Sequence, residues 1–279
     1  MRHFYILLIL SFIGVKLIAQ DLINIGQQSE INASKSLKIY RPGDAKLHPD
    51  EIPADHQFNQ NKNSLLNIWP EDKTVWVKFT IKNQNQYPLP IIIEFRNAAI
   101  SHISYFIRNK YLLIYQKNGF QNTAIRNQNI RSRFPIKQIT LEPNITYTVY
   151  AKISGTDHKL KIPVTIYDQH GFNKKSSIDN LESGLFYGIF ITLFLSALLF
   201  LILRFRIKEQ LTFIAYLLLF TGLFFIMDGY AAQYILLDNA AIIALITRSY
   251  GFLLIGVFSL FLKIYFKSYI GKNVYTKLF

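Results

Sequence analysis

Two charged residues lie within or beside stretches that are otherwise apolar. Arg248 falls inside an apolar run that begins at Ala240, and Asp228 follows directly after another apolar run. A charged side chain in a membrane-length segment is costly, so it needs a partner or a route to water. The sequence leaves two interpretations open: Arg248 extends to the membrane–water interface, or it pairs with Asp228.

The polar half of the chain contains candidate ligand contacts. Trp76 lies in an alternating segment on the face opposite the apolar side chains, where an exposed aromatic ring could stack on a sugar. A tryptophan in a strand is more often part of the core. Tyr105 is a further aromatic candidate. Arg131 and Arg133 either bind an anionic group through paired hydrogen bonds or remain solvated charges at a strand edge.

Catalytic and metal-binding patterns are absent from the sequence. It has no cysteine, and its six histidines show no metal-ligand spacing. No HExxH, G-x-S-x-G or Walker pattern occurs. We therefore expect neither an enzyme nor a bound cofactor or metal.

Residues 184–203 form a run of twenty residues without a charge, and Arg204, Arg206 and Lys208 follow it. At about 1.5 Å per residue, a helix of this length spans the roughly 30 Å hydrocarbon core of a bilayer. Two further apolar runs, at 211–227 and 240–262, predict a domain of three transmembrane helices over 184–262. Gly184 and Gly188 form a GxxxG pattern that favours close helix packing.

The positions of the basic residues orient these helices. Basic residues follow the first and third runs, whereas the loop at 228–239 has two acids and no lysine or arginine. The positive-inside rule therefore places the short basic tail, 263–279, in the cytoplasm and the N-terminal domain outside it. Residues 1–19 predict a signal peptide that ends before Gln20, with an uncleaved anchor as the alternative.

Residues 20–168 predict an extracytoplasmic β-sandwich of jelly-roll or immunoglobulin-like type. Short alternating or apolar segments recur between turn signals, at 36–40, 74–82, 91–95, 100–107, 111–115, 134–141, 147–153 and 162–166. Residues 169–183 are polar and predict a juxtamembrane linker.

The chain carries a formal net charge of +14. Its basic residues are scattered along strand-like segments and accompany export signals, which argues against nucleic acid as a partner. We expect instead a lipid bilayer together with an anionic surface, glycan or lipid headgroup.

The sequence resembles the seven-transmembrane receptors with diverse intracellular signalling modules, a bacterial family. The sandwich segments that carry this resemblance are 75–79 with Asn83, 102–106, 131–135 and 147–153. The membrane segments are 184–189, which opens the first helix, 213–216, and 228–231. Together they cover about residues 30–262.

This resemblance implies a sensor in the bacterial inner membrane that binds a small extracytoplasmic ligand, with carbohydrate as the implied class. The family has seven helices and usually a cytoplasmic output module, whereas three helices are predicted here. The chain is therefore expected to be a fragment, or a short form that works with a partner signalling protein or a second copy. The alternative is a membrane-anchored binding or scaffold module that does not signal.

Overall fold

A computed structural model describes residues 22–26, 28–42, 52–69, 72, 74–100, 102–109, 113–118, 132–154, 159–234 and 240–270. Only the backbone is described for 113–118, 232, 240–248 and 268–270. The predicted signal peptide at 1–19, Arg131, the side chain of Arg248 and the tail beyond residue 270 lie outside this description.

The larger sheet contains seven of the described strands. Their bounds are β1 Leu22–Ile25, β3 Lys38–Tyr40, β4 Asn59–Gln60, β6 Thr74–Asn83, β8 His102–Arg108, β9 Leu113–Asn118 and β11 Thr146–Ser154. The strand order is β4-β3-β6-β11-β8-β9, and β1 pairs in parallel with β6. The long strand β6 is central because β3 and β11 both pair with it antiparallel.

A second sheet has the order β10-β7-β13-β2. Its strands are β2 Glu30–Asn32, β7 Leu89–Phe95, β10 Ile136–Leu141 and β13 Val164–Asp168. A separate pair joins β5 Leu66–Ile68 to β12 Leu160–Ile162, and two short 3-10 helices are η1 Ser34–Ser36 and η2 Asp55–Gln57. All pairs in the second sheet are antiparallel.

Both sheets contribute to one core, which confirms the predicted β-sandwich. The alternation of β6 places one set of apolar side chains on its inner face, and β7 supplies the facing set: Val75, Val77, Phe79, Ile81, Ile91, Ile93 and Phe95. The predicted strands at 74–82, 91–95 and 147–153 correspond to β6, β7 and β11.

The outer faces of both sheets are covered as well. On the larger sheet the covering cluster consists of Phe58, Trp76, Phe106 and Tyr150. On the smaller sheet it consists of Ile92, Ile136, Tyr167 and Phe172. The first cluster is closed by the segment after η2, and the second is closed by a helix.

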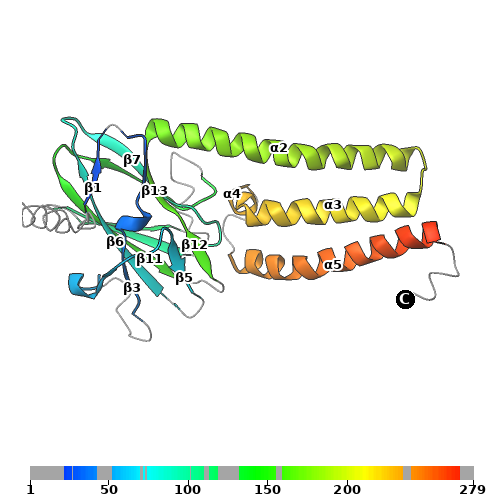
Figure 1. Cartoon of the computed structure of the whole chain (residues 1–279), viewed down its shortest axis with the longest axis horizontal. Helices are drawn as coiled ribbons and strands as arrows, with labels where there is room; N and C mark the ends of the chain where they lie inside the picture. The colour runs from blue at the N-terminus through cyan, green and yellow to red at the C-terminus, as the bar shows by residue number, and fades with distance from the viewer. Residues whose placement is uncertain are drawn as a thin grey trace, which may run out of the picture.

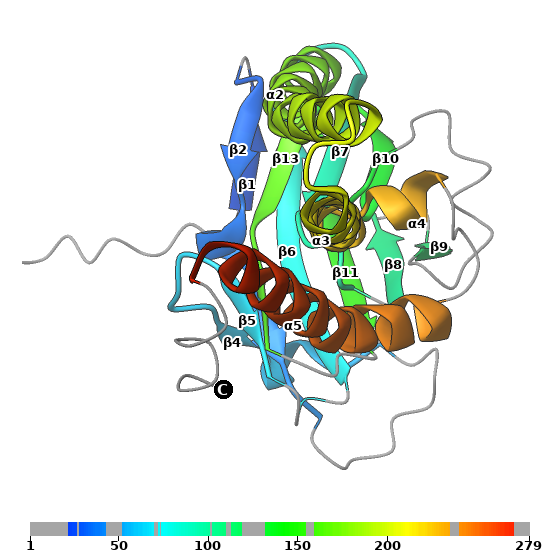
Figure 2. The same cartoon turned by 90° about the vertical axis from the view of Figure 1, so that its right-hand side faces the viewer.

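That helix, α2, runs without a break over Gln169–Ile202. It is followed by α3 Ile207–Met227, the short α4 Tyr230–Tyr234 and α5 Ala240–Ile270. By length and composition, Gln169–Ile202, Ile207–Met227 and Ser249–Lys267 of α5 could each cross a membrane. The three long helices extend from one end of the sandwich, with α3 between α2 and α5 (Figures 1 and 2).

The segment predicted as a polar linker, 169–183, is therefore the beginning of α2 rather than a separate connection. The helix begins directly after β13, where Oδ1 of Asp168 accepts a hydrogen bond from the backbone N–H of Gly171 at 2.6 Å. Gly171 lies against the backbone just before β2: a Cβ there would overlap the carbonyl oxygen of Ser29. The sheet and the helix thus meet at a position where no side chain fits.

Gly171→Ala should separate the start of α2 from the sheet. The added methyl group meets backbone, which cannot rotate away, so we expect a loss of stability of about 1–3 kcal/mol. Thermal unfolding of the purified full chain measures this loss. The control is Gly184→Ala on the same helix, where a Cβ meets no described atom within 4 Å. Equal melting temperatures for the two variants would contradict the observed docking.

Candidate functional site at the sandwich–helix junction

The first turns of α2 pack on the outer face of the smaller sheet. The ring of Phe172 lies edge-on to that of Tyr167, with centroids 6.0 Å apart, and contacts the cluster formed with Ile92 and Ile136. Burying a phenylalanine side chain in this way contributes about 2 kcal/mol or more. This apolar contact fixes the base of a membrane helix to a sheet of the sandwich.

Two turns further along α2, Asp179 is buried among basic side chains. Arg96, which follows β7, donates from Nη2 to Oδ1 of Asp179 at 2.9 Å, and its Nη1 lies 2.9 Å from Oδ2. Nζ of Lys175, one turn back on α2, donates to Oδ1 at 2.6 Å. The directional hydrogen bond from Arg96, together with the close second contact, gives the docked helix a defined rotation.

Arg133 connects three parts of the molecule. Its Nη2 lies 3.8 Å from Oδ2 of Asp179, and its Nη1 donates to Oγ of Ser183 at 3.3 Å. Its guanidinium also lies over the rings of Phe134 and Tyr230, at 5.0 and 4.9 Å from their centroids. Arg133 is therefore not a solvated edge charge: it holds the sandwich, α2 and α4 together. Binding of an anionic group by Arg133 stays a prediction.

The turn between α3 and α4 also contacts the sandwich. Gly229 has a φ of +85°, and a Cβ there would lie 2.8 Å from Cβ of Ala98 and 2.9 Å from the carbonyl oxygen of Arg133. Glycine tolerates this positive φ, and without a side chain it leaves room for the neighbouring atoms. Asp228, just before it, accepts a hydrogen bond from the hydroxyl of Tyr187 on α2 at 3.0 Å. Its pairing with Arg248 stays a prediction, since that side chain is outside the description.

A polar cavity of about 340 Å³ lies at this junction. The residues that line it come from strand β7, the segment before β10, and helices α2 and α4: Glu94, Ser132, Arg133, Phe134, Phe172, Lys175, Ser176, Asp179, Asn180, Tyr230, Gln233 and Tyr234. Acidic, basic, amide and hydroxyl groups thus surround one space between the sandwich and the helices.

Glu94 is the least satisfied charged group of this cavity. It is only 4% exposed, and its Oε2 accepts no hydrogen bond from any described residue. The nearest described cation is Arg96, whose Nη1 lies 3.9 Å from Oε2. Burial raises the pKa of Glu94 to about 7, and the nearby Arg96 offsets only part of this effect.

Trp76 and Tyr105 need correction as ligand contacts. Trp76 is fully buried, and its ring packs against Phe106 with centroids 5.3 Å apart. Tyr105 is 1% exposed and faces Phe95 in the core. Neither ring is available for stacking on a sugar, because the outer face of the larger sheet is covered by its own aromatic cluster and the inner face is the core.

The GxxxG prediction is also corrected. A Cβ added to Gly184 or Gly188 would meet no described atom within 4 Å, so neither glycine lies in a close helix contact within the described structure. The close contact is elsewhere: a Cβ at Gly222 on α3 would lie 2.8 Å from the hydroxyl oxygen of Tyr250 on α5.

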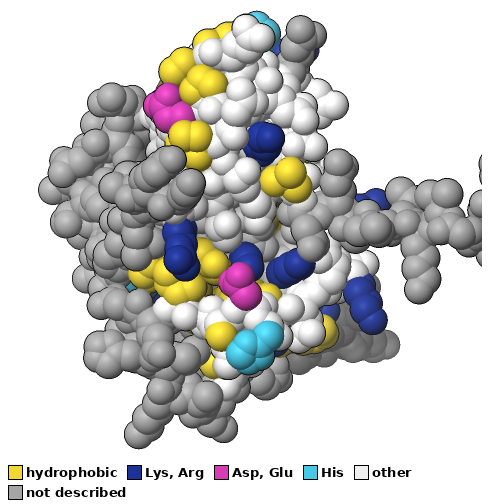
Figure 3. Space-filling view, turned by 90° about the vertical axis from the view of Figure 1, so that its left-hand side faces the viewer, with side chains coloured by type: hydrophobic (Ala, Val, Ile, Leu, Met, Phe, Trp, Pro, Cys, Tyr) yellow, Lys and Arg dark blue, Asp and Glu magenta, His cyan; other side chains and the backbone are white. Residues whose placement is uncertain are grey.

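At the end of the sandwich that points away from the helices, basic side chains are interspersed with acidic and apolar ones over the described surface (Figure 3). The junction is the candidate site because its described residues surround a cavity with groups of both charges. Its residues Glu94, Arg96 and Asp179 were not predicted, although a glutamate in the apolar run at 91–95 is a detectable signal.

The fold and this junction define the class: a membrane protein with an extracellular-type β-sandwich in direct contact with its membrane-length helices. Residues 34–168 match the sequence model of the family described as 7TMR-DISM extracellular 2. The match covers the sandwich and confirms the resemblance seen in the sequence for these residues. Together with the three helices, it supports a receptor-like role at a membrane.

No curated protein matches the chain. Among solved structures, a β-glucosidase from Kluyveromyces marxianus in complex with glucose is 14% identical, with a TM-score of 0.26, over 47% of this chain and 16% of that one. TmCBM61 in complex with β-1,4-galactotriose is 7% identical, with a TM-score of 0.23, over 50% and 84%. At these scores the similarities identify neither a ligand nor an activity.

Glu94→Gln should change how stability depends on pH. The pKa of Glu94 is about 7 in the folded chain and near 4.5 when unfolded, so the folded state binds more protons between these values. The free energy of unfolding should therefore fall by roughly 3 kcal/mol as the pH rises from about 4.5 to 7. The glutamine variant lacks this contribution, and thermal unfolding in detergent across this pH range compares the two. If the stabilities of the two proteins change with pH in the same way, the pKa of Glu94 is not raised in the folded chain.

Proposed function

We propose that this chain is the sensing and membrane-crossing part of a bacterial inner-membrane receptor. The sandwich lies outside the cytoplasm and binds a small ligand, for which the family resemblance suggests carbohydrate. The helices carry the bound or free state of the sandwich to an output on the cytoplasmic side, in a partner signalling protein or a second copy.

The unbroken course of α2 is the observation that carries this proposal. From Phe172 on the sheet to Ile202 at the far end, the helix rises about 45 Å without a non-helical residue. A helix attached rigidly at its base transmits a tilt or rotation of the sheet to its other end. A flexible tether between the sandwich and the helix would not do this.

The sandwich contacts the helices at two places, so α2 and α3 can respond differently to a change in the sandwich. The sandwich contacts α2 through Phe172 and Asp179, and contacts the α3–α4 turn through Ala98 and Arg133. A rearrangement of the sandwich that affects these two contacts unequally moves α2 relative to α3. A ligand shifts the receptor only if it binds the sandwich more tightly in one of the two arrangements.

The arrangement of basic residues supports the orientation. Arg204 and Arg206 lie between α2 and α3, and Lys267 lies in the last turns of α5. Both regions lie at the ends of the helices that point away from the sandwich (Figure 1). The positive-inside rule then puts these ends in the cytoplasm and the sandwich on the opposite side.

Phosphatase fusions test this orientation, since the enzyme folds only outside the cytoplasm. A fusion after Asn239 should be active and one after Lys272 inactive, because these positions lie on opposite sides of the third helix. Immunoblotting confirms that both fusions are present in similar amounts. Activity at both positions, or the reverse pattern, would refute the orientation.

Arg133→Gln tests the coupling between the sandwich and α4. The variant loses the contacts with Asp179 and Tyr230, so amide hydrogen exchange over 228–234 should accelerate by about tenfold, the effect of one to two kcal/mol in local opening. The experiment uses the full chain in nanodiscs.

The matched control is Lys159→Gln, which removes a cation–aromatic contact with Trp69 (3.6 Å to the centroid) elsewhere on the sandwich. It should leave exchange over 228–234 unchanged. If Arg133→Gln also leaves it unchanged, the sandwich and helices are not coupled through this contact, and the chain is better described as an anchored binding or scaffold module.

A further inference from the structure

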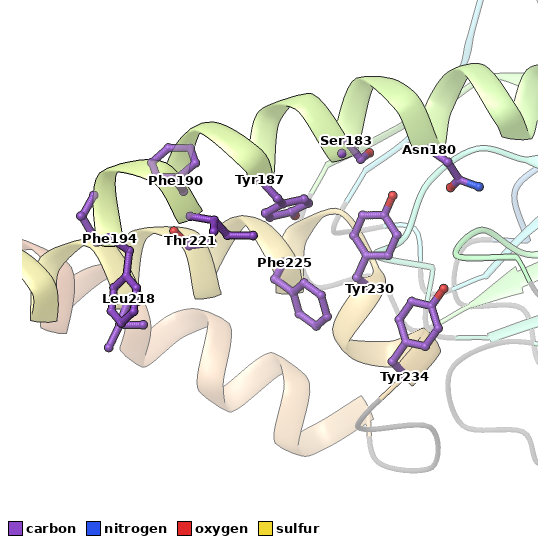
Figure 4. A pocket seen from close by; sticks show the side chains of 13 residues that line it. Asn180, Ser183, Tyr187, Phe190, Phe194, Leu218, Thr221, Phe225, Tyr230 and Tyr234 are labelled. Atoms are coloured by element: carbon purple, nitrogen blue, oxygen red, sulfur yellow. The ribbon is translucent and has the colours of Figure 1, made fainter. Parts of the chain in front are cut away.

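The polar cavity at the junction continues into an apolar crevice between α2 and α3. The crevice has a volume of about 540 Å³ and shares Asn180, Tyr230 and Tyr234 with the polar cavity. Figure 4 shows the two tyrosine side chains of α4 pointing toward α2 at the end of the crevice nearest the sandwich. A polar space and an apolar space therefore meet where the helices leave the sandwich.

The crevice has the depth of one membrane leaflet. Along α2 its lining begins at Asn180, and the part within the predicted membrane segment runs from Gly184 to Phe194, ten residues that rise about 15 Å. This is half of the roughly 30 Å hydrocarbon core. Its wall is almost entirely apolar below the tyrosines, with Phe190, Ile191, Phe194, Leu217, Leu218 and Phe225. At the end of the crevice nearest the sandwich, Gly184 has no side chain to fill the crevice, and a Cβ there would meet no described atom within 4 Å.

The polar cavity offers both kinds of charge to a headgroup. Glu94 is buried, and its Oε2 has no hydrogen-bond donor among the described residues. Arg133 and Lys175 line the same space. Each uses one of its several N–H groups on Ser183 or Asp179, which leaves others to donate. A group that carries an ammonium and a phosphate matches this set: the ammonium donates to the carboxylate, and the phosphate accepts from the basic side chains.

We propose that this composite site binds one phospholipid with a primary ammonium headgroup, phosphatidylethanolamine, with the headgroup in the polar cavity and an acyl chain in the crevice. Phosphatidylcholine fills the same volume, but its quaternary ammonium has no N–H to donate to Glu94. Phosphatidylglycerol has no cation. This site goes beyond the proposed receptor function: it does not require the ligand of the sandwich, and the proposed orientation enters only in assigning the lipid to the outer leaflet.

Lipid competition on the purified full chain tests the site. Phosphatidylethanolamine, phosphatidylcholine and phosphatidylglycerol with identical acyl chains are added in mixed micelles, and native mass spectrometry counts the retained lipid. We expect phosphatidylethanolamine to be retained at about tenfold lower concentration than the other two, the effect of one hydrogen bond to a buried charge. Equal retention of the three lipids would overturn the assignment without touching the receptor proposal, which is tested by hydrogen exchange.

Two variants separate the headgroup from the chain. Glu94→Gln should remove the preference for phosphatidylethanolamine over phosphatidylcholine while both lipids still bind. Gly184→Leu fills the crevice and should lower retention of every lipid about tenfold. The control is Gly256→Leu on α5, where a Cβ also meets no described atom within 4 Å and which lines neither cavity. Equal retention by the two leucine variants would mean that another helix or a second copy occupies the crevice.

Discussion

The buried carboxylate of Asp179 determines how the membrane helices attach to the sandwich. Arg96 binds it from the sheet and Lys175 from α2 itself, while Arg133 approaches from the loop before β10. Removing one partner from a buried ion pair costs about 3–5 kcal/mol, because the remaining charge is left without compensation. These groups therefore keep one arrangement or change together, and the position of α2 on the smaller sheet follows from theirs.

Helix α2 lies in two different environments: its first half packs on the sandwich, and its second half is suited to hydrocarbon. Its first half buries Gly171, Phe172 and Asp179 against the sandwich, whereas beyond Gly184 only Ala197 is buried among the residues described. The second half exposes large apolar side chains, which are stable in hydrocarbon but not in water. Since all backbone groups within a helix are paired internally, the chain passes between these environments without leaving an unpaired amide. The transition therefore needs no flexible residues, and the helix stays continuous.

The sequence predicted those parts whose signal is local. Strand β6 was found because apolar side chains recur at every second position over residues 74–82, whereas β1, β2 and β5 have three or four residues each and too little pattern. The start of α2 was missed because its polar residues face water and only a few are buried. Trp76 is buried in a cluster with Phe106 and Phe58, which come from distant parts of the sequence. The contact between Arg96 and Asp179 joins residues 83 positions apart, so no local pattern could reveal it.

The junction combines contacts with different physical demands. The packing of Phe172 on Tyr167 is apolar and tolerates small rotations, so it holds the base of α2 in place while allowing the helix to turn. The charged cluster is directional and selects one rotation, yet a buried ion pair adds little net stability compared with apolar packing. A second arrangement in which every charge again has a partner is therefore accessible, whereas one that leaves a buried charge unpaired is not. Glu94 lies 3.9 Å from Arg96, so any group that binds this carboxylate acts on the same cluster that sets the rotation of α2.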